Sequence, residues 1–137
     1  MRKLDNINIG IYEKALPKNI SWEERIKLVK ECGYDFMEIS IDETDERLAR
    51  LEYSKEEIKE IRDYLLDADV RIPSMCFSGH RRFPMGSMSQ ETRDKAMELM
   101  EKAIVFADRL WIRIIQLAGY DVYYEEGNEQ TKKYFIE

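Results

Sequence analysis

Short apolar runs alternate along the chain with longer segments in which apolar residues recur every three or four positions. The short runs have the length and composition of β-strands. They are residues 7–12, 35–41, 71–77 and 112–118. The longer segments have the spacing of amphipathic helices. This order predicts an α/β domain whose parallel strands are joined by right-handed helical crossovers.

The first two predicted helices begin with a capping signal. Ser21 is followed by Glu24, and Ser54 is followed by Glu57, which is the spacing of a capping box. Gly33 supplies a stop signal for the first helix. Apolar residues at helical spacing mark the faces that we expect to be buried. They are Ile26, Val29 and Cys32 in the first helix, and Ile58, Ile61 and Leu65 in the second.

A third helix is predicted to begin near Ser87 or Ser89, and a fourth to begin at Asn128. We interpret the apolar stripe of the third helix as part of the core. The stripe consists of Ala96, Met97, Met100, Ile104 and Ala107. With no linker in the sequence, residues 1–137 are expected to form one domain of about four parallel strands, three helices and the start of a fourth.

Two folds fit this order of elements: an open doubly wound sheet, and part of a (β/α)8 TIM barrel, which needs eight units and about 250 residues. In the second run Met37 and Ile39 share one face, whereas Glu38 and Ser40 share the other. A doubly wound sheet has helices on both faces, so its strands should be apolar throughout. The polar face therefore favours half of a TIM barrel, whose interior opens into a site.

Composition narrows the class of partner. The chain has 22 Lys and Arg against 28 Asp and Glu, a net charge of -6, with 44% hydrophobic and 36% charged residues. These values are typical of a globular domain. They argue against nucleic acid or an anionic membrane as a partner, because such binding depends on clustered positive charge. A small anionic substrate is still compatible, since a few local arginines suffice for one phosphate.

The two cysteines and the N-terminal stretch bear on the compartment. Cys32 and Cys76 lie far apart and in no metal-ligand spacing, so we interpret them as reduced core thiols. The N-terminal stretch has no long apolar run, so we expect no signal peptide. No segment approaches the roughly 18 apolar residues of a membrane span. We expect a cytoplasmic protein.

Polar residues gather at the C-terminal ends of the predicted strands, the edge at which α/β folds of this type bind ligands. In chain order they are Glu13 and Lys14, then Glu38, Ser40 and Asp42, then Ser78, His80, Arg81 and Arg82, and finally Gln116.

Several of these residues have a structural alternative. His80, the only histidine, is a candidate for a site or for a satisfied loop residue. Arg81 and Arg82 suit a phosphate, which the planar guanidinium binds bidentately, or could pair with the acidic segment 42–46. Glu38 is expected to point into the barrel, where it would be costly without a partner. Its role as base, ligand or ion-pair member stays open.

Other chemistry is poorly supported by the residues. The carboxylates and the single histidine do not form a complete metal site. There is no Gly-rich phosphate loop, no GxSxG and no CxxC pair. The tyrosines near the C-terminus, Tyr120, Tyr123 and Tyr124, are expected to cover a loop or an interface. Spacing alone therefore predicts only a ligand-binding α/β domain.

Four stretches, taken in order, closely resemble the L-ribulose-5-phosphate 3-epimerase group. They read GIYEKALP, EISIDETDERLARL, RIPSMCFSGHRRFPMGS and IRIIQLAGYDVYYEE. Some members are named L-xylulose-5-phosphate 3-epimerase or hexulose-6-phosphate isomerase, and the group belongs to the xylose-isomerase-like TIM barrels. The resemblance extends from about Ile7 to the C-terminus, so it covers essentially the whole chain.

The resemblance implies an isomerase that inverts a carbon next to the carbonyl of a sugar phosphate through a metal-stabilised enediolate. Members of the group are full barrels, and their acid/base carboxylates and divalent-metal ligands lie in the second half. No catalytic residue and no metal ligand is therefore assigned in this chain, which is expected to be inactive and without a cofactor when alone. The residues implied as a substrate-binding wall are Glu13, Glu38, Ser40, Ser78, His80, Arg81 and Gln116.

Two further expectations follow from a half barrel of this kind. Its outer strands would be open edges, and its inner face would lack an opposite wall, so we expect a homodimer or higher oligomer. The chain departs from the group at Trp111, where the group favours glycine in a helix-to-strand turn. The alternative function is a non-catalytic half-barrel module that binds or assembles by self-association.

Overall fold

The computed structural model describes residues 7–137. Four parallel strands lie side by side in the order of the chain. They are β1 (Gly10–Tyr12), β2 (Phe36–Ile41), β3 (Ser74–Phe77) and β4 (Ile114–Leu117). The four predicted parallel strands are confirmed, although each strand covers only part of the apolar run that predicted it. Residues 1–6, part of the stretch in which we expect no signal peptide, lie outside the described residues.

Within residues 7–137, five helices connect or follow the strands. They are α1 (Trp22–Glu31), α2 (Asp45–Ala49), α3 (Lys55–Ala68), α4 (Gln90–Arg109) and α5 (Glu129–Ile136). Short 3-10 turns are η1 (Glu13–Ala15), η2 (Arg50–Glu52) and η3 (Gly79–Arg81). The short α2 was not predicted, because its sequence lies in the acidic segment after β2 and has no apolar stripe of its own.

The predicted helix starts are confirmed in detail. The Ser21 hydroxyl accepts a hydrogen bond from the Glu24 N–H, and the Ser21 N–H donates to the Glu24 carboxylate. The same reciprocal pair joins Ser54 and Glu57 at the start of α3. Of the two serines considered for α4, Ser89 is the cap.

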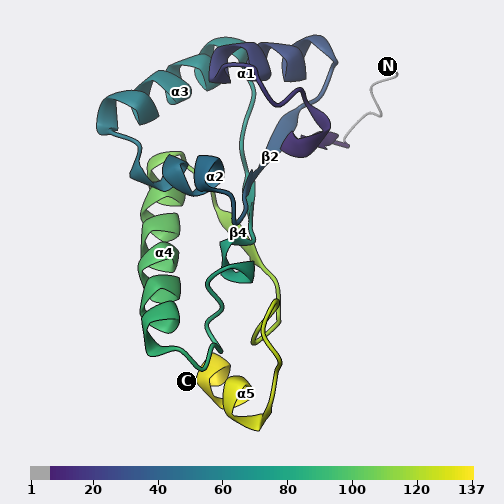
Figure 1. Cartoon of the computed structure of the whole chain (residues 1–137). Coiled ribbons are helices and arrows are strands. Elements are labelled where there is room, and N and C mark those ends of the chain that lie inside the picture. The colour runs from purple at the N-terminus through teal and green to yellow at the C-terminus, as the bar shows by residue number, and fades with distance from the viewer. Residues whose placement is uncertain (1–6) are drawn as a thin grey trace.

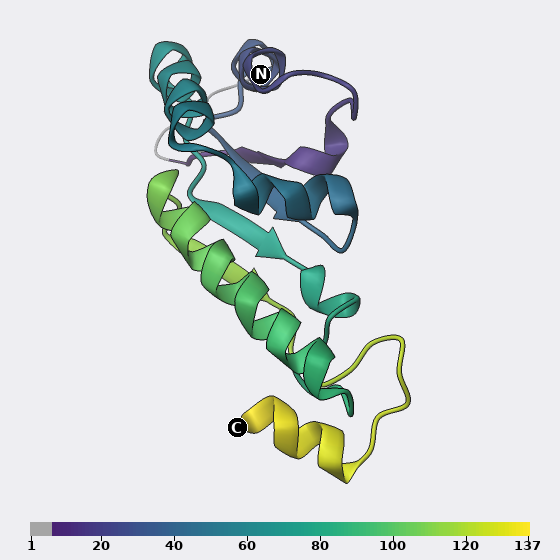
Figure 2. The same ribbon diagram turned by 60° about the vertical axis from the view of Figure 1, so that its left-hand side comes forward.

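The hydrophobic core lies between α1, α3 and α4 and one face of the sheet (Figures 1 and 2). Met37, Ile39 and Ile41 of β2 and Met75 and Phe77 of β3 supply the sheet side. Because the strands follow one another in sequence order and the helices that form the core pack on one face, the sheet has the architecture of half a TIM barrel. A doubly wound sheet would carry helices on both faces.

Two predictions about the core are wrong. Met97 and Ile104 of α4 are each 53% exposed, although we expected them in the core. The buried face of α4 is Ala96, Leu99, Ala103, Phe106 and Ala107, so Ala96 and Ala107 are buried as predicted and the rest of the packing comes from a second apolar stripe. Cys32 is also exposed rather than a core thiol, because α1 ends there. Cys76 is half-buried.

The turn after α4 places Trp111 in an unusual backbone conformation. The Ile112 N–H donates to the Ala107 carbonyl at 2.8 Å. The Trp111 N–H donates to the Asp108 carbonyl at 3.1 Å, which completes a Schellman motif. Trp111 has φ of 62°, a region that glycine normally fills. Its indole lies against the Arg62 guanidinium of α3, 5.0 Å from Cζ to the ring centroid.

Both outer strands have an open edge among the described residues. β1 pairs with β2 alone, and β4 pairs with β3 alone. Several large apolar side chains on α4, on the turn after it and on β4 are exposed, and we call them the β4 flank. The flank consists of Met97, Ile104 and Val105 of α4, Trp111, and Ile114 and Leu117 of β4. No helix in the described part of the chain is long and apolar enough to cross a membrane.

Candidate substrate-binding face

The face of the sheet opposite the core carries the polar positions that the sequence singled out. Strand register places Tyr12 beside Glu38, and Ser74 beside Ile114. It also places Ser40 beside Cys76, and Cys76 beside Gln116. Since register partners in a parallel sheet point to the same side, these residues share one face. The structure therefore brings together Glu38, Ser40 and Gln116 from the predicted set.

Glu38 has the partner that its position requires. Its carboxylate accepts a hydrogen bond from the Ser74 hydroxyl at 2.5 Å, across β2 and β3. Both residues are half-buried, so the Glu38 carboxylate is still partly accessible to solvent. Gln116 is exposed on β4. A carboxylate and an amide on one face can accept from, and donate to, the hydroxyls of a small polar ligand.

Ser40 and Ser78, at the ends of β2 and β3, are less exposed to solvent than Glu38 and Gln116. Ser40 is fully buried, and its hydroxyl has no partner among the described residues. The N–H of Ser78 donates to the Ile41 carbonyl at 2.8 Å, which continues the pairing of β2 and β3 past the end of β3. Ser78 is also buried, so its backbone bond fixes the path of the chain into η3.

Glu13 lies in an arrangement that sequence reasoning missed. The side chain is completely buried and is surrounded by three arginines. Arg50 donates to both carboxylate oxygens at 2.8 and 3.0 Å, and the Ser40 N–H donates at 2.9 Å. Arg47 and Arg25 complete the ion pairs at 2.5 and 3.5 Å. This placement favours an architectural role over the substrate contact that we expected.

The charge state of Glu13 follows from these contacts. Burial alone would raise the pKa of the Glu13 carboxyl. The hydrogen bonds and charge of Arg50, together with the Ser40 N–H and Arg47, outweigh burial and lower the pKa below its ordinary value. Glu13 is therefore an anion that links the turn after β1 to the segment containing α2 and η2.

A second carboxylate at the same edge is also held ionised. Asp42 follows β2 and forms an ion pair with Lys14 at 2.7 Å. Burial would raise the pKa of Asp42, but hydrogen bonds from Lys14 and Thr44 lower it to about 2. Lys14 and Asp42 thereby tie the ends of β1 and β2 together.

His80 lies away from the open face. Its Nε2 is 3.1 Å from the Ala96 carbonyl of α4, so that nitrogen carries the proton. Its ring makes an edge-to-face contact with Phe77, with 4.8 Å between centroids. Burial lowers the pKa of His80 and outweighs the effect of the Ala96 bond. His80 is therefore a buried residue of η3 that contacts Phe77 and the backbone of α4, which supports the alternative of a satisfied loop residue.

Arg81 and Arg82 both turn toward the acidic segment after β2. Arg82 donates to the Asp45 carboxylate at 2.6 Å. Arg81 is 3.9 Å from the Glu43 carboxylate and lies over the Tyr123 ring. The pairing alternative raised from the sequence is therefore observed for both arginines, tightly for Arg82 and loosely for Arg81.

A divalent metal, which the resemblance implies, does not fit the residues that are described. Within residues 7–137 no group of three or more histidine, cysteine, aspartate or glutamate side chains is placed to hold an ion. Glu38 bonds to Ser74, and His80 bonds to the backbone of α4. We therefore assign no step to a metal held by this chain.

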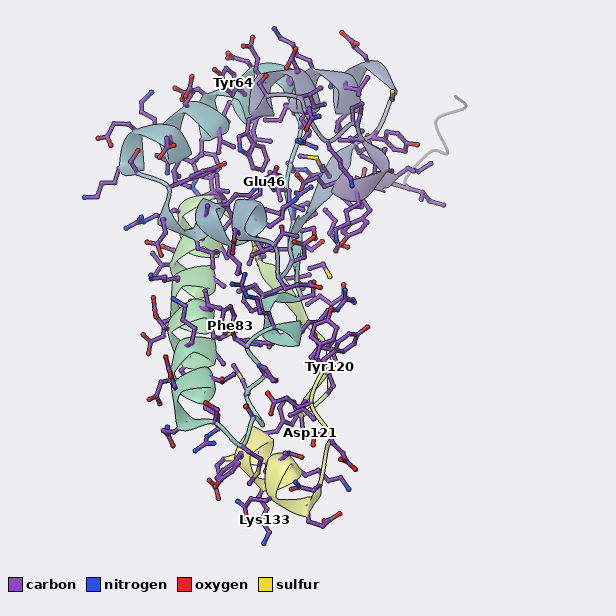
Figure 3. The ribbon with its side chains drawn as sticks, viewed as in Figure 1. Glu46, Tyr64, Phe83, Tyr120, Asp121 and Lys133 are labelled. Carbon is purple, nitrogen blue, oxygen red and sulfur yellow. The ribbon has the colours of Figure 1, made fainter. Side chains whose placement is uncertain are left out.

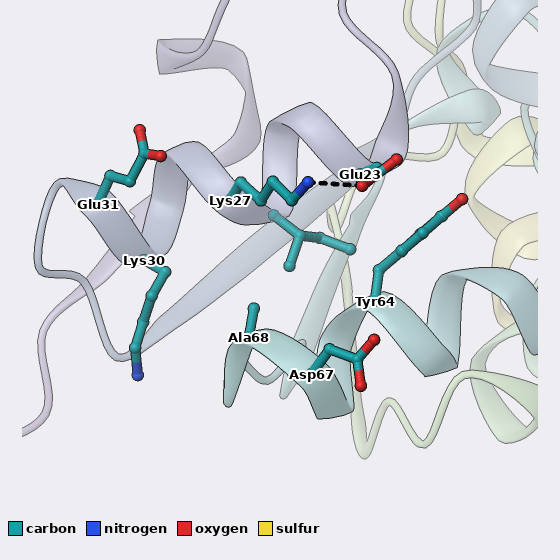
Figure 4. A pocket seen from close by; sticks show the side chains of 8 residues that line it. Glu23, Lys27, Lys30, Glu31, Tyr64, Asp67 and Ala68 are labelled. Atoms are coloured by element: carbon teal, nitrogen blue, oxygen red, sulfur yellow. Dashed lines mark hydrogen bonds and ion pairs between the residues drawn. The ribbon is translucent and has the colours of Figure 1, made fainter.

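A groove on the helical side of the molecule is unrelated to this face. It encloses about 480 Å³ between α1 and α3 and is lined by Ile26, Lys27, Tyr64, Asp67 and their neighbours (Figure 4). It lies on the helices that cover the core, so it offers no access to the polar face of the sheet.

The fold and the polar inner face define a class of protein. A family model described as "Xylose isomerase-like TIM barrel" matches residues 26–137, and the chain belongs to this family. Its curated relatives are named as epimerases. One from Haemophilus influenzae, provisionally named L-ribulose-5-phosphate 3-epimerase SgbU, is 56% identical over 129 residues. The L-ribulose-5-phosphate 3-epimerase UlaE of Shigella boydii is 53% identical over 129 residues.

These relatives are longer than the chain. Each match covers 94% of this chain and 45% of the relative, so the chain spans about half the length of the curated relatives it matches. A crystal structure of D-psicose 3-epimerase with D-fructose superposes with a TM-score of 0.75 at 16% identity, over 95% of this chain and 45% of that one. The structural match confirms the barrel fold.

Proposed function

We propose that this chain forms one half of the barrel of a sugar-phosphate 3-epimerase and supplies one wall of its substrate pocket. The observation that carries the proposal is the 56% identity to a relative named as an L-ribulose-5-phosphate 3-epimerase, which extends over 94% of the chain. The reaction of such an enzyme removes a proton from a carbon next to a carbonyl and returns one to the opposite side.

The role of this half is to bind and orient the substrate. Glu38, held by Ser74, accepts from a sugar hydroxyl, and the Gln116 amide donates to or accepts from another. Ser40 and Ser78 fix the backbone at the ends of the strands. The buried Glu13 and His80 stabilise that backbone from the side of the core. The proton-transfer groups belong to the opposite half of the barrel, so the chain alone is inactive. The cytoplasmic location expected from the sequence stays a prediction.

The experiment is an epimerisation assay with L-ribulose 5-phosphate. The chain is assayed alone and mixed with a polypeptide that corresponds to the second half of the Haemophilus influenzae relative. We expect no turnover by the chain and measurable turnover by the mixture. In the mixture, Glu38→Gln should lower kcat/KM about tenfold or more, because it removes a charged hydrogen-bond acceptor. Glu31→Gln, an exposed change on α1, is the matched control and should have no effect.

Turnover by the chain alone would overturn the claim of inactivity. An inactive mixture, assayed beside an active complete relative, would favour a second candidate. That candidate is a non-catalytic half-barrel module that self-associates. The exposed β4 flank supports it, because unpaired edges and large apolar patches are typical of assembly surfaces.

A further inference from the structure

The turn after α4 holds a tryptophan at the surface in a backbone conformation that costs free energy. Apart from glycine, only Asp69 and Trp111 among the described residues have a positive φ, 51° and 62°. The short side chain of an aspartate tolerates this conformation, whereas a bulky side chain is strained in it. Trp111 is 54% exposed, so only part of its indole is buried in the folded chain. A strained residue at the surface is a candidate for a functional contact.

Arg62 of α3 fixes the direction of the indole. Its Cζ is 5.0 Å from the centroid of the Trp111 ring, and its Nη1 donates to the Arg109 carbonyl at the end of α4 at 3.4 Å. Tyr64, two positions further along α3, lies on another side of the helix and lines the groove against α1 (Figure 3). The indole is thus held in one orientation on a side of α3 away from that groove, which lowers the entropy cost of binding a partner.

The two helices that meet at this turn each add an exposed apolar side chain. Leu66, which is 64% exposed, lies one turn beyond Arg62 on the same side of α3. On α4, the exposed Ile104 lies one turn before Asp108, whose carbonyl accepts the hydrogen bond from the Trp111 N–H. Tryptophan and arginine are enriched among the few residues that supply most of the binding energy of protein interfaces. These features together are typical of an interaction surface.

Unpaired charges of both signs flank the indole. Asp108, Arg109 and Arg113 are exposed, and none of them forms an ion pair with another residue of the described range 7–137. A contact between two identical surfaces requires a surface that is complementary to itself. An apolar centre with both signs of charge beside it meets this requirement, whereas charges of a single sign would repel their own copy. The surface therefore fits a second copy of this chain.

We propose that Trp111 anchors an interface between two copies of this chain. In a two-fold contact, the side of each indole that Arg62 leaves free packs against Leu66 of the other copy. Asp108 of one copy then lies near the arginines of the other, so the flanking charges gain partners. The contact lies at the turn before β4 and is distinct from pairing along the open edge of that strand. It goes beyond the proposed epimerase function and does not depend on it.

The fluorescence of Trp111 reports this contact directly. The chain has 2 tryptophans, so Trp111 is the single emitter in Trp22→Phe. The emission and its quenching by acrylamide are measured from nanomolar to high micromolar protein, beside sedimentation velocity of the same samples. We expect the emission to move to shorter wavelength and the quenching to fall as the protein associates. Both changes should have their midpoint at the concentration at which the dimer forms in sedimentation.

Trp111→Gly, made in the unchanged chain, separates the interface from the fold. Glycine adopts the positive φ without strain, so the variant keeps the turn. We expect the dimer dissociation constant to rise about tenfold or more. The melting temperature of the dilute monomer should change little, because relief of strain offsets the lost contact with Arg62. The matched control is Met88→Gly, at the other end of α4, because Met88 is also 54% exposed. It should change the dissociation constant less than about twofold.

Three results would overturn the proposal. They are a monomer at every concentration, a dimer that forms without a change in the Trp111 emission, and equal weakening of the dimer by the two glycine variants. An emission shift that appears only when the second-half polypeptide is added would also overturn it, because Trp111 would then lie between the two halves. The epimerase assay of the mixture is a separate measurement, so an inactive mixture refutes the proposed function and leaves this interface standing.

Discussion

Three arginines surround a single carboxylate at the ends of β1 and β2, and this arrangement decides what Glu13 does. Removing the charge would leave Arg25, Arg47 and Arg50 buried without a counter-ion. Breaking a buried ion pair from one side costs about 3–5 kcal/mol, because the remaining charge stays desolvated. We expect Glu13→Gln to lower the free energy of unfolding by about this amount, measured by urea denaturation.

The matched control for Glu13 is Glu23→Gln. Glu23 pairs with Lys27 at 2.6 Å on the surface of α1, and such exposed pairs contribute little. Its urea midpoint should equal that of the unchanged chain. Equal losses of stability in the two variants would contradict the architectural role of Glu13.

Asp42 gives a prediction at acidic pH. Its folded-state pKa of about 2 lies below the ordinary value of 3.8, so the folded state binds this proton more weakly than the unfolded state does. Its contribution to stability is therefore fully present above the ordinary value and is lost as the pH falls through about 2. Thermal unfolding between pH 4 and pH 2 should show a shallower pH dependence for Asp42→Asn. Parallel curves for both proteins would contradict the assignment.

The chemistry of single residues was only partly predictable from the sequence. That Glu38 needed a partner followed from its place on the inner face, and Ser74 provides one. The roles of Glu13 and His80 could not be predicted, because their partners lie on other elements. Arg50 is 37 residues from Glu13, and Ala96 is 16 residues from His80. The side chain of a polar residue after a strand can point toward solvent or toward the neighbouring helix. Its direction is determined by tertiary packing, which the local sequence does not specify.

At the scale of elements, the segment after β4 is held against the loop before α4. The Gly86 N–H donates to the Asp121 carbonyl at 2.9 Å, and the Ser87 hydroxyl donates to Glu125 at 2.9 Å. Arg93 of α4 lies over the ring of Tyr134 of α5, 3.8 Å from Cζ to the centroid. α5 therefore packs near the start of α4, away from α1 and α3 (Figure 1).

Gly86 is required where these segments meet. A Cβ atom there would lie 2.5 Å from the Thr131 carbonyl oxygen and 2.6 Å from the Asp121 carbonyl oxygen. We expect Gly86→Ala to lower the free energy of unfolding by about 1–3 kcal/mol and to speed amide hydrogen exchange in α5. Gly119→Ala is the control, because a Cβ there meets nothing within 4 Å. Unchanged exchange in α5 for Gly86→Ala would show that this contact does not hold the segment.

The starts of the helices were well predicted because both residues of a capping box lie close together in the sequence. Ser21 and Ser54 are the two examples. The core face of α4 was predicted only in part: Ala96 and Ala107 are buried as expected, whereas Met97 and Ile104 are exposed to solvent. The helix has two apolar stripes, and periodicity alone does not say which one packs inward.

At the scale of the whole molecule, residues 7–137 form a half barrel whose two outer strands each have an open edge. Pattern alone favoured the barrel because one strand face turns polar, and the order of the four parallel strands confirms it. The exposed side chains of the β4 flank leave apolar surface in contact with solvent. A soluble half barrel should bury that surface against another copy or against a complementary half.

Sedimentation velocity of the chain alone tests this account most directly. We predict a dimer or larger species at micromolar concentration, with Ile104→Glu shifting the equilibrium toward monomer. The control Lys59→Glu, on the exposed side of α3, should leave the equilibrium unchanged. A compact, folded monomer across the whole concentration range would contradict the claim that these residues form an open half barrel in need of a partner.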